Sequence, residues 1–355
     1  MILPLLSVSL LIIFFYAAFY LVVISRRDLD KETGKHLDLQ DITLIIPFRN
    51  EAHCIDRIIH ALHEQSAHPF EIIFIDDHST DKSVQVLKDE LIDSPLNFRL
   101  YHLTDSYGKK AAIHLGVDHA ETNFILQWDA DIIPHKNYFE NLSQLEIQDM
   151  WVLPVALRSN VSGLKFFEWD YLFFHALSYK VRNWRVLTAS GANLLYKKSG
   201  YLEVIEETKG KEYLSGDDYF LLNGFESKKK TIGVSASETV SVQTYLPGTI
   251  KGCLQQRLRW LSKSNWLEYG AILFLTLVNL HFLLLLFPFS VTGLIIIGLK
   301  TMIDIALVRE YLKGMKKKEI YAVPIFFLGL PFYVLLLFLA SIILKKEWKG
   351  RALKK

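Results

Sequence analysis

Residues 42–81 read ITLIIPFRNEAHCIDRIIHALHEQSAHPFEIIFIDDHSTD. A short apolar run ends at Pro47, residues 51–65 carry apolar side chains at helical spacing, and a second apolar run stops at Asp76. Apolar runs of this length bounded by breakers are typical of buried strands, and the segment between them is long enough for a crossover helix. The stretch therefore predicts a strand–helix–strand unit with parallel strands.

The same alternation continues along the chain to about residue 128. Further strands are expected at 98–103 and 124–128, and further helices at 81–91 and 109–120. Such alternation predicts an α/β fold with a mainly parallel mixed sheet flanked by helices. Ligands of such sheets bind at the carboxyl ends of the strands. Polar segments fall at or near these ends: Pro47 to Glu51, Asp76 to Asp81, Tyr107 to Lys110, and Asp129-Ala130-Asp131.

Asp129 and Asp131 are two residues apart and follow an apolar strand. If the strand continues through them, both carboxylates leave the same face of the sheet. Two adjacent carboxylates repel each other unless a cation or a proton lies between them. Carboxylate oxygens suit Mg²⁺ and Mn²⁺, so the triplet is a candidate metal site, although Asp-x-Asp on its own is weak evidence.

Together these segments resemble the family-2 glycosyltransferases with the GT-A fold, over about residues 41–260. Seven motifs occur in the family's order. They are Ile45 to Glu51, Ile75 to Asp81, Gly108 to Ala112, Asp129 to Asp131, Gly191-Ala192-Asn193, Gly216-Asp217-Asp218 and Gln256-Arg257-Leu258-Arg259-Trp260. The last fits the Gln-x-x-Arg-Trp motif of membrane members of the family.

The resemblance implies a role for each of these segments. It places the divalent metal, Mn²⁺ or Mg²⁺, on Asp131 and the general base on Asp218, with Asp217 as a competitor for that role. Donor binding falls on Pro47, Asn50, Glu51, Asp77, Lys109 and Asp129. Binding of the acceptor and the diphosphate falls on Gly191, Ala192, Asn193, Gln256, Arg259 and Trp260.

The chemistry of these side chains agrees with those roles. A positioned carboxylate can take the proton of an acceptor hydroxyl during attack. The Arg259 guanidinium can stabilise a departing diphosphate through paired hydrogen bonds. Membrane members of the family invert the anomeric centre in one displacement, so an inverting enzyme is expected.

Apolar residues make up 51% of the 355 residues and charged residues 22%. The apolar excess lies at the two ends of the chain. Residues 1–24 carry no charge and precede Arg26-Arg27, which predicts an uncleaved anchor with a cytosolic middle domain. The later apolar block with Pro288 near its centre is either one tilted helix or a hairpin, and we favour the hairpin. The expected division is an anchor at 1–25, a catalytic domain at 41–245, an interfacial helix at 246–268, a transmembrane region of two or three helices at 269–345 and a basic tail at 346–355.

The sequence therefore predicts an integral protein of the cell membrane that moves one sugar from a nucleotide-sugar donor to a lipid or lipid-linked glycan acceptor. The net charge of +2 gives no reason to expect nucleic-acid binding. A processive polysaccharide synthase and a catalytically silent membrane protein that keeps the fold are the alternatives; a nucleotidyltransferase would lack Gln-x-x-Arg-Trp beside membrane helices. Two cysteines suggest no disulfide framework, and His53, His60, His63 and His68 match no zinc motif and are expected to be surface or structural residues.

Overall fold

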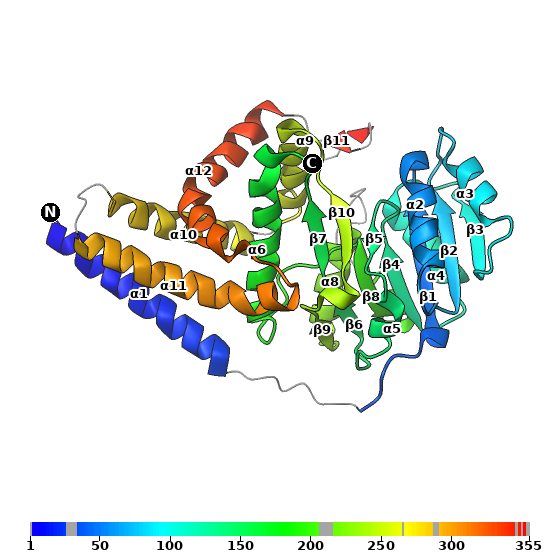
Figure 1. Cartoon of the computed structure of the whole chain (residues 1–355), viewed down its shortest axis with the longest axis horizontal. Coiled ribbons are helices and arrows are strands. Elements are labelled where there is room, and N and C mark those ends of the chain that lie inside the picture. The colour runs from blue at the N-terminus through cyan, green and yellow to red at the C-terminus, as the bar shows by residue number, and fades with distance from the viewer. Residues whose placement is uncertain are drawn as a thin grey trace.

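The computed structural model describes residues 2–25, 34–205, 216–264, 266–286, 291–344, 347–348 and 351–352. Figure 1 shows the strands on one side of the molecule, long helices from both chain ends on the other, and helix α6 (Lys165–Val181) standing between them. Arg26-Arg27, Pro288, Lys345-Lys346 and most of the expected basic tail lie outside the described residues.

The expected α/β fold is confirmed, and the predicted strands and helices of the first half of the chain differ from the observed ones by only a residue or two at most ends. A seven-stranded sheet has the order β3-β2-β1-β4-β8-β6-β9, and β5, β10 and β7 form a smaller sheet. The strands are β1 Ile42–Phe48, β2 Glu71–Asp76, β3 Phe98–His102, β4 Phe124–Trp128, β5 Ile133–Pro134, β6 Met150–Val152, β7 Val155–Arg158, β8 Asn193–Lys197, β9 Ile232–Val234 and β10 Val242–Tyr245. The remaining helices of this part are α2 Ala52–His63, α3 Ser83–Leu91, α4 Lys109–His119, α5 Tyr138–Leu142, α7 Lys198–Ile205, α8 Asp217–Ser227 and α9 Ile250–Leu261.

Strand β1 lies in the middle of this sheet and is parallel to both β2 and β4. Its pairing with β4 ends at Ile45, whereas its pairing with β2 continues through Pro47. Proline has no N–H to donate to a neighbouring strand. Pro47 is tolerated in β1 because it lies beyond Ile45, where the pairing with β4 ends. The strand is therefore longer than expected and delivers residues 49–51 to the edge where β2 also ends.

The two faces of β1 follow the period-two alternation of a strand. Leu44 and Ile46 pack in the apolar cluster that contains α2 and α3, whereas Ile45 packs in the cluster that contains α4 and α8. Helix α4 approaches β1 closely at Gly116, because this residue has no side chain. A methyl group added at Gly116 would lie 2.8 Å from Ile45 Cγ2. Burial on both faces fixes the strand register, and with it the position of every loop at the carboxyl edge.

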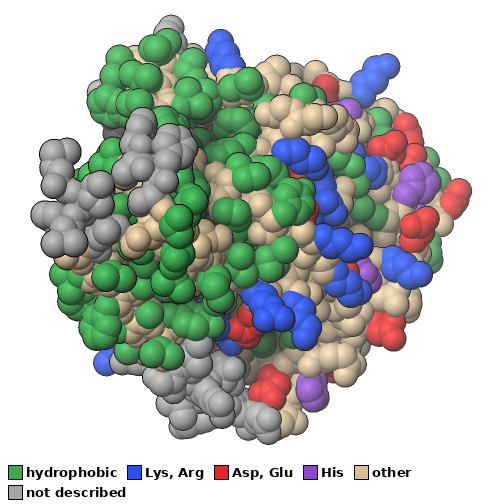
Figure 2. Space-filling view, turned by 60° about the vertical axis from the view of Figure 1, so that its left-hand side comes forward, with side chains coloured by type: hydrophobic (Ala, Val, Ile, Leu, Met, Phe, Trp, Pro, Cys, Tyr) green, Lys and Arg blue, Asp and Glu red, His purple; other side chains and the backbone are tan. Residues whose placement is uncertain are grey.

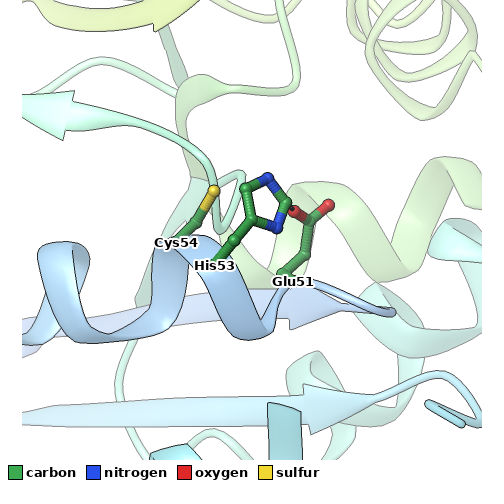
Figure 3. Close-up of side chains that lie close together, drawn as sticks. All are labelled: Glu51, His53 and Cys54. Atoms are coloured by element: carbon green, nitrogen blue, oxygen red, sulfur yellow. Dashed lines mark ion pairs between the residues drawn. The ribbon is translucent and has the colours of Figure 1, made fainter. Parts of the chain in front are cut away.

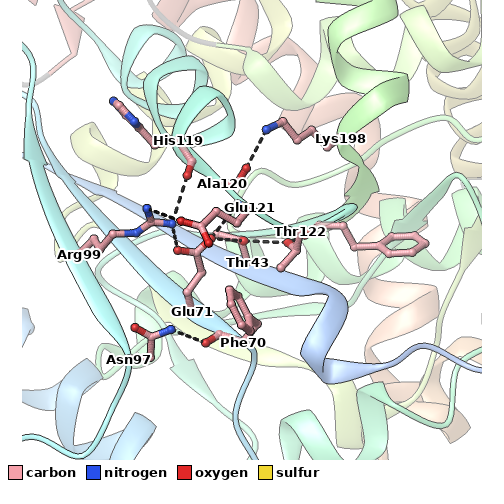
Figure 4. Close-up of polar contacts among 11 residues, drawn as sticks. Thr43, Phe70, Glu71, Asn97, Arg99, His119, Ala120, Glu121, Thr122 and Lys198 are labelled. Carbon is pink, nitrogen blue, oxygen red and sulfur yellow. Dashed lines mark hydrogen bonds and ion pairs between the residues drawn. The ribbon is translucent and has the colours of Figure 1, made fainter.

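The opposite edge of the sheet is held by a buried carboxylate. Glu71 begins β2 and accepts hydrogen bonds from the Thr43 hydroxyl at 2.8 Å and the Glu121 N–H at 3.0 Å (Figure 4). The Arg99 guanidinium pairs with the other oxygen of Glu71. A buried charge is tolerated when its lone pairs are satisfied in this way, so the network ties β1, β2, β3 and the loop before β4 together.

In the described residues, four apolar helices lie outside the seven-stranded sheet: α1 Ile2–Ser25, α10 Trp266–Leu284, α11 Val291–Gly314 and α12 Ala322–Ile343. By length and composition, 291–314 and 319–343 could each cross a membrane, and 7–22 and 268–284 are shorter apolar segments. The block expected to be one helix or a hairpin contains two helices, α10 and α11. Figure 2 shows apolar side chains gathered over one part of the surface, with Lys and Arg side chains along its border.

Candidate functional site

The loops after β1 and β2 are locked to each other at the carboxyl edge of the sheet. Asn50 has a left-handed backbone with φ of 53°. Its side-chain oxygen accepts the Thr80 N–H at 2.8 Å, and its own N–H donates to Ser79 Oγ at 3.0 Å. Asp77 is buried, and its N–H donates to the Phe48 carbonyl at 2.9 Å. The predicted donor residues of both loops therefore lie side by side.

Glu51 lies close to His53 and Cys54 at the start of α2 (Figure 3). The Glu51 carboxylate is 4.0 Å from His53 Nε2, and the imidazole is exposed. Burial raises the pKa of the Cys54 thiol to about 11. A thiol binds metal as the thiolate, so this group is a poor metal site. The Glu51 N–H donates to Ser83 Oγ at 2.8 Å, which holds Glu51 beside the loop after β2.

Lys109, at the start of α4, lies at the centre of the site. Its ammonium is 2.6 Å from Asp129 Oδ1 and 3.4 Å from Asp217 Oδ2, and it donates to the Gly191 carbonyl at 3.2 Å. Burial by itself would lower the pKa of Lys109, but the Asp129 and Asp217 carboxylates outweigh burial and raise it. A permanently charged ammonium thus joins four segments that are far apart in the sequence.

The two residues of the acidic pair are held differently. Asp217 Oδ2 accepts from Gln127 Nε2 at 2.6 Å and pairs with Lys109. Burial tends to raise the pKa of Asp217, but Lys109, Lys263 and the Gln127 hydrogen bond hold it below its ordinary value. Asp218 accepts the Gly191 N–H at 3.1 Å and the N–H of Tyr219 at 2.8 Å. Asp217 is therefore the carboxylate tied into the lysine network, whereas Asp218 accepts hydrogen bonds from two backbone N–H groups.

The Asp129-Ala130-Asp131 triplet is a turn, because β4 ends at Trp128. The strand does not continue through the triplet, so the condition for both carboxylates to leave the same face is not met. The turn is instead held by Arg57, whose guanidinium donates to the Asp131 carbonyl at 3.2 Å. Asp129 pairs with Lys109, and Asp131 extends the acidic edge towards α2.

Of the three residues Gly191, Ala192 and Asn193, only Gly191 contacts the acidic pair. A methyl group added there would lie 2.5 Å from Asp217 Oδ2 and 2.7 Å from Gln127 Nε2. The Asn193 amide is fully buried: it accepts from Trp128 and Tyr138 and donates to the Pro154 and Val240 carbonyls. Asn193 thus anchors β8, while Ala192 is buried beside it.

Helix α9 carries Gln256, Arg259 and Trp260 and is anchored by Arg257, which donates to Gln256 Oε1. The buried Arg257 donates through Nε to Asp170 Oδ2 at 2.7 Å, and its guanidinium stacks 4.7 Å from the Trp260 ring. The Tyr333 hydroxyl of α12 donates to the same Asp170 oxygen at 2.8 Å. One carboxylate of α6 therefore fixes α9 against α12, which sets the position of Arg259 and Trp260.

Arg259 lies close to the acidic residues. Desolvation lowers the pKa of Arg259, while the electrostatic attraction of Asp218, Asp129 and Asp217 opposes that change. No ion pair joins its guanidinium to a carboxylate in the described part of the chain. The predicted diphosphate-binding residue Arg259 is thus a partly buried cation that forms no ion pair with a carboxylate of the described residues.

Four side chains of this region were not predicted from the sequence. Gln127 bonds Asp217 from within an apolar strand, and Lys263 lies four residues after Arg259. Tyr171 and His175 of α6 stack at 3.8 Å, and His175 Nδ1 donates to the Tyr171 carbonyl at 2.9 Å. Only Lys263 carried a usable signal, because residues four apart near a helix end share a face.

Comparison with known proteins agrees with this geometry. Residues 43–204 match the model of the family described as Glycosyl transferase family 2. The match runs from β1 to α7. The fold is of the GT-A type: the chain superimposes on a mannosyltransferase from Pyrobaculum calidifontis, solved with GDP-Man and Mn²⁺, with a TM-score of 0.55, 15% identity and coverage of 96% of this chain and 97% of that one.

Two curated relatives are similar over shorter stretches. The undecaprenyl-phosphate 4-deoxy-4-formamido-L-arabinose transferase of Pseudomonas fluorescens is 31% identical over 94 residues, which is 26% of this chain and 28% of the relative. The 4,4'-diaponeurosporenoate glycosyltransferase of Staphylococcus aureus is 31% identical over 119 residues, covering 31% of this chain and 29% of the relative. The chain thus spans less than a third of the length of each relative.

Proposed function

We propose that the protein is an inverting glycosyltransferase that moves a sugar from a nucleotide-diphosphate donor to a lipid or lipid-linked glycan acceptor at the membrane. The observation that carries the proposal is the meeting of Lys109, Asp129, the acidic pair 217–218 and Arg259 at one edge of the sheet. The names of two relatives, an undecaprenyl-phosphate sugar transferase and a diaponeurosporenoate glycosyltransferase, support a lipid acceptor.

Asp218 is the residue that we assign as general base. Asp217 shares its carboxylate with Lys109 and Gln127, and a carboxylate neutralised in this way is a weak proton acceptor. Asp218 is oriented by backbone N–H groups. It would take the proton of the acceptor hydroxyl as that oxygen attacks the anomeric carbon, while Asp217 holds Lys109 in place.

The charges of the site support a divalent cation. Lys109, Arg259 and Lys263 supply three positive charges, against four carboxylates from residues 129, 131, 217 and 218. A divalent cation would turn this net negative charge of one into a positive charge of one, which matches an anionic diphosphate. Asp131, with Asp129 beside it, offers the oxygen ligands that Mn²⁺ and Mg²⁺ prefer. Such an ion would neutralise charge on the leaving nucleoside diphosphate.

Membrane attachment would come from the apolar helices at the two chain ends. Helices α11 and α12 are long and apolar enough to cross a bilayer, and α1 and α10 contain shorter apolar segments. In this arrangement the catalytic domain faces the cytosol, where nucleotide sugars are made, and α9 lies at the membrane surface beside α12. We assign the protein to the cell membrane and a single sugar transfer.

The test is a donor-hydrolysis and transfer screen over several nucleotide sugars with Mn²⁺ or Mg²⁺, using the full chain in detergent. Asp218→Asn is expected to lower kcat by roughly 10²- to 10⁴-fold. Asp131→Ala is expected to abolish the increase in turnover that added metal produces in the wild type. Asp118→Asn changes an exposed carboxylate on α4 and should leave turnover unchanged.

Unchanged turnover in both Asp218→Asn and Asp131→Ala would contradict the mechanism. Absence of turnover with every donor would favour a catalytically silent protein. Long polymer from purified protein would contradict the assignment of single transfer.

A further inference from the structure

Helix α12 is long and apolar enough to cross a bilayer, but its contacts are not those of a crossing helix. A straight helix of its 22 residues would be about 33 Å long, close to the thickness of the hydrocarbon layer. If it crossed, only one of its ends could lie beside the catalytic domain, because a sheet with open edges and loops cannot enter the hydrocarbon. The contacts at its two ends therefore decide between a crossing and another arrangement.

The first end of α12 lies beside the catalytic domain. In the loop before it, Lys316 pairs at 3.2 Å with Glu238, which lies between β9 and β10. The ring centroid of Phe326, in the second turn of α12, is 5.2 Å from the ring centroids of both Phe166 and Phe173 of α6. The start of α12 is therefore on the same side of the membrane as the sheet.

The second end of α12 returns to the same domain. The Tyr333 hydroxyl donates to Asp170 of α6 at 2.8 Å. Farther along, Leu337 and Ala340 are buried in the apolar cluster that α9 shares with the sheet, and Leu344 packs against that cluster. Figure 1 shows the last turns of α12 beside α9, whereas the N-terminus of the chain lies on the far side of the molecule from the sheet. Both ends of α12 thus contact the catalytic domain, so the helix runs along this domain and does not lead away from it.

The opposite face of α12 is apolar and exposed. Its side chains include Ile325, Phe332, Leu335, Phe338 and Ile342, which are between 54% and 68% exposed. A helix that is apolar all round must be covered all round, and α6 and α9 cover only one side of α12. The apolar part of the surface in Figure 2 is bordered by Lys and Arg side chains, as expected where a protein meets lipid head groups. The exposed face of α12 therefore fits an apolar medium and not water.

The positive charges on either side of α12 favour the same arrangement. Four lysines lie in residues 313–318, before the helix, and Lys345-Lys346 follow Leu344 directly in the sequence. A crossing helix would put these two groups on opposite sides of the membrane, whereas positive loops gather on the cytosolic side. If α12 does not cross, both groups and Arg26-Arg27 are cytosolic, and the rule is satisfied throughout.

We propose that α12 lies in the plane of the membrane at its cytosolic surface, with the exposed apolar face inserted between lipids and the other face on the catalytic domain. The partner of this face is the lipid bilayer, and the crossings are left to α1, α10 and α11. Asp170, which Tyr333 contacts, also binds Arg257, so the inserted helix holds α9 at the membrane surface. The inference rests on the membrane attachment proposed above and is independent of the reaction.

The first test asks on which side of the membrane each end of α12 lies, using single added cysteines in the full chain in membrane vesicles. Lys318→Cys places a thiol before α12 and Lys355→Cys places one after it, while Lys82→Cys marks the catalytic domain. Cys54 and Cys253 are buried, so the wild type gives the background. A maleimide that cannot cross membranes should label all three variants from the same side. Labelling of Lys318→Cys and Lys355→Cys from opposite sides would overturn the proposal.

The second test measures depth with a fluorophore on cysteines at Ile325, Leu335 and Ile342, quenched by lipids brominated at known positions of the acyl chain. All three are expected at a similar depth, about 5–10 Å below the surface. A crossing helix would instead place Leu335 deepest, about 15 Å from either surface. Ile92→Cys, an exposed apolar position next to α3, is the control and should not be quenched.

The remaining outcomes separate this inference from the proposed function. No quenching at any of the three positions would mean that protein, such as a second copy of the chain, covers the face, and the proposal would fall. Release of the chain from vesicles by alkaline carbonate would contradict membrane attachment, and with it the proposed function. Opposite-side labelling of a chain that stays in the vesicles would overturn the placement of α12 alone.

Discussion

Gly191→Ala is expected to lower the activity of the site while the fold survives. The added methyl group would lie 2.5 Å from Asp217 Oδ2, 2.7 Å from Gln127 Nε2 and 2.9 Å from Lys109 Nζ. All three atoms are ends of side chains, so they can move without shifting the backbone. They cannot move independently, however, because they are joined by an ion pair and a hydrogen bond.

The size of the effect follows from this geometry. Overpacking of this kind costs about 1–3 kcal/mol. If that strain falls on the catalytic arrangement, the rate drops roughly 5- to 160-fold, at 1.36 kcal/mol for each factor of ten. The backbone of Gly191 is not left-handed, so alanine adds no conformational strain and the loss is steric alone.

The assay compares kcat for sugar transfer and the thermal unfolding temperature in detergent. Gly163→Ala is the matched control, since a methyl group there meets nothing within 4 Å. We expect that control to keep wild-type rates and Gly191→Ala to lose activity with only a small fall in unfolding temperature. Wild-type activity in Gly191→Ala would refute the view that Lys109, Gln127 and Asp217 act as one unit.

Three further predictions concern stability. Glu71→Ala should destabilise the fold by about 3–5 kcal/mol, because it leaves Arg99 without its buried partner, and chemical denaturation should show a smaller loss for the exposed partner variant Glu121→Ala. Burial lowers the pKa of His175 to about 4 against the attraction of Asp170 and Asp218. The unfolded chain therefore binds a proton near pH 6.5 that the folded chain does not, so about 2 kcal/mol of stability should be lost as the pH falls from 7 to 5. His175→Gln should not show this loss. An identical dependence of stability on pH in the wild type and His175→Gln would exclude this role. Lys300 pairs with Asp304 at 2.5 Å inside the apolar helices, so Lys300→Met alone should lower the unfolding temperature more than Lys300→Met with Asp304→Leu.

Local patterns predicted the sheet well because burial on two faces leaves a direct record in the sequence. Ile45 and its neighbours in β1 form an apolar run long enough for one strand, and helical spacing in 51–65 marks α2. The triplet at Asp129 shows where this reasoning stops. Continuation of β4 was a local assumption, whereas the turn depends on Arg57, which lies more than seventy residues earlier in the chain.

Neighbouring residues of one motif also took different roles that spacing could not assign. Arg257 and Arg259 are two apart on α9, yet Arg257 is an anchor bonded to Asp170 and Arg259 faces the acidic pair. Gly191 and Asn193 are likewise two apart, but only Gly191 contacts the site. These differences arise from which neighbour each side chain meets, and those neighbours come from other elements of the fold.

The sequence by itself determined the α/β architecture, the edge of the sheet at which polar residues gather and the apolar segments at both ends, because each leaves a pattern within a few dozen residues. The tertiary structure alone decided that Lys109 joins Asp129 to Asp217, that Asp218 is held by backbone N–H groups, and that Lys263 lies over Gly216. Charges interact over a few ångströms regardless of their separation along the chain, so only folding could bring these groups together and set their division of labour.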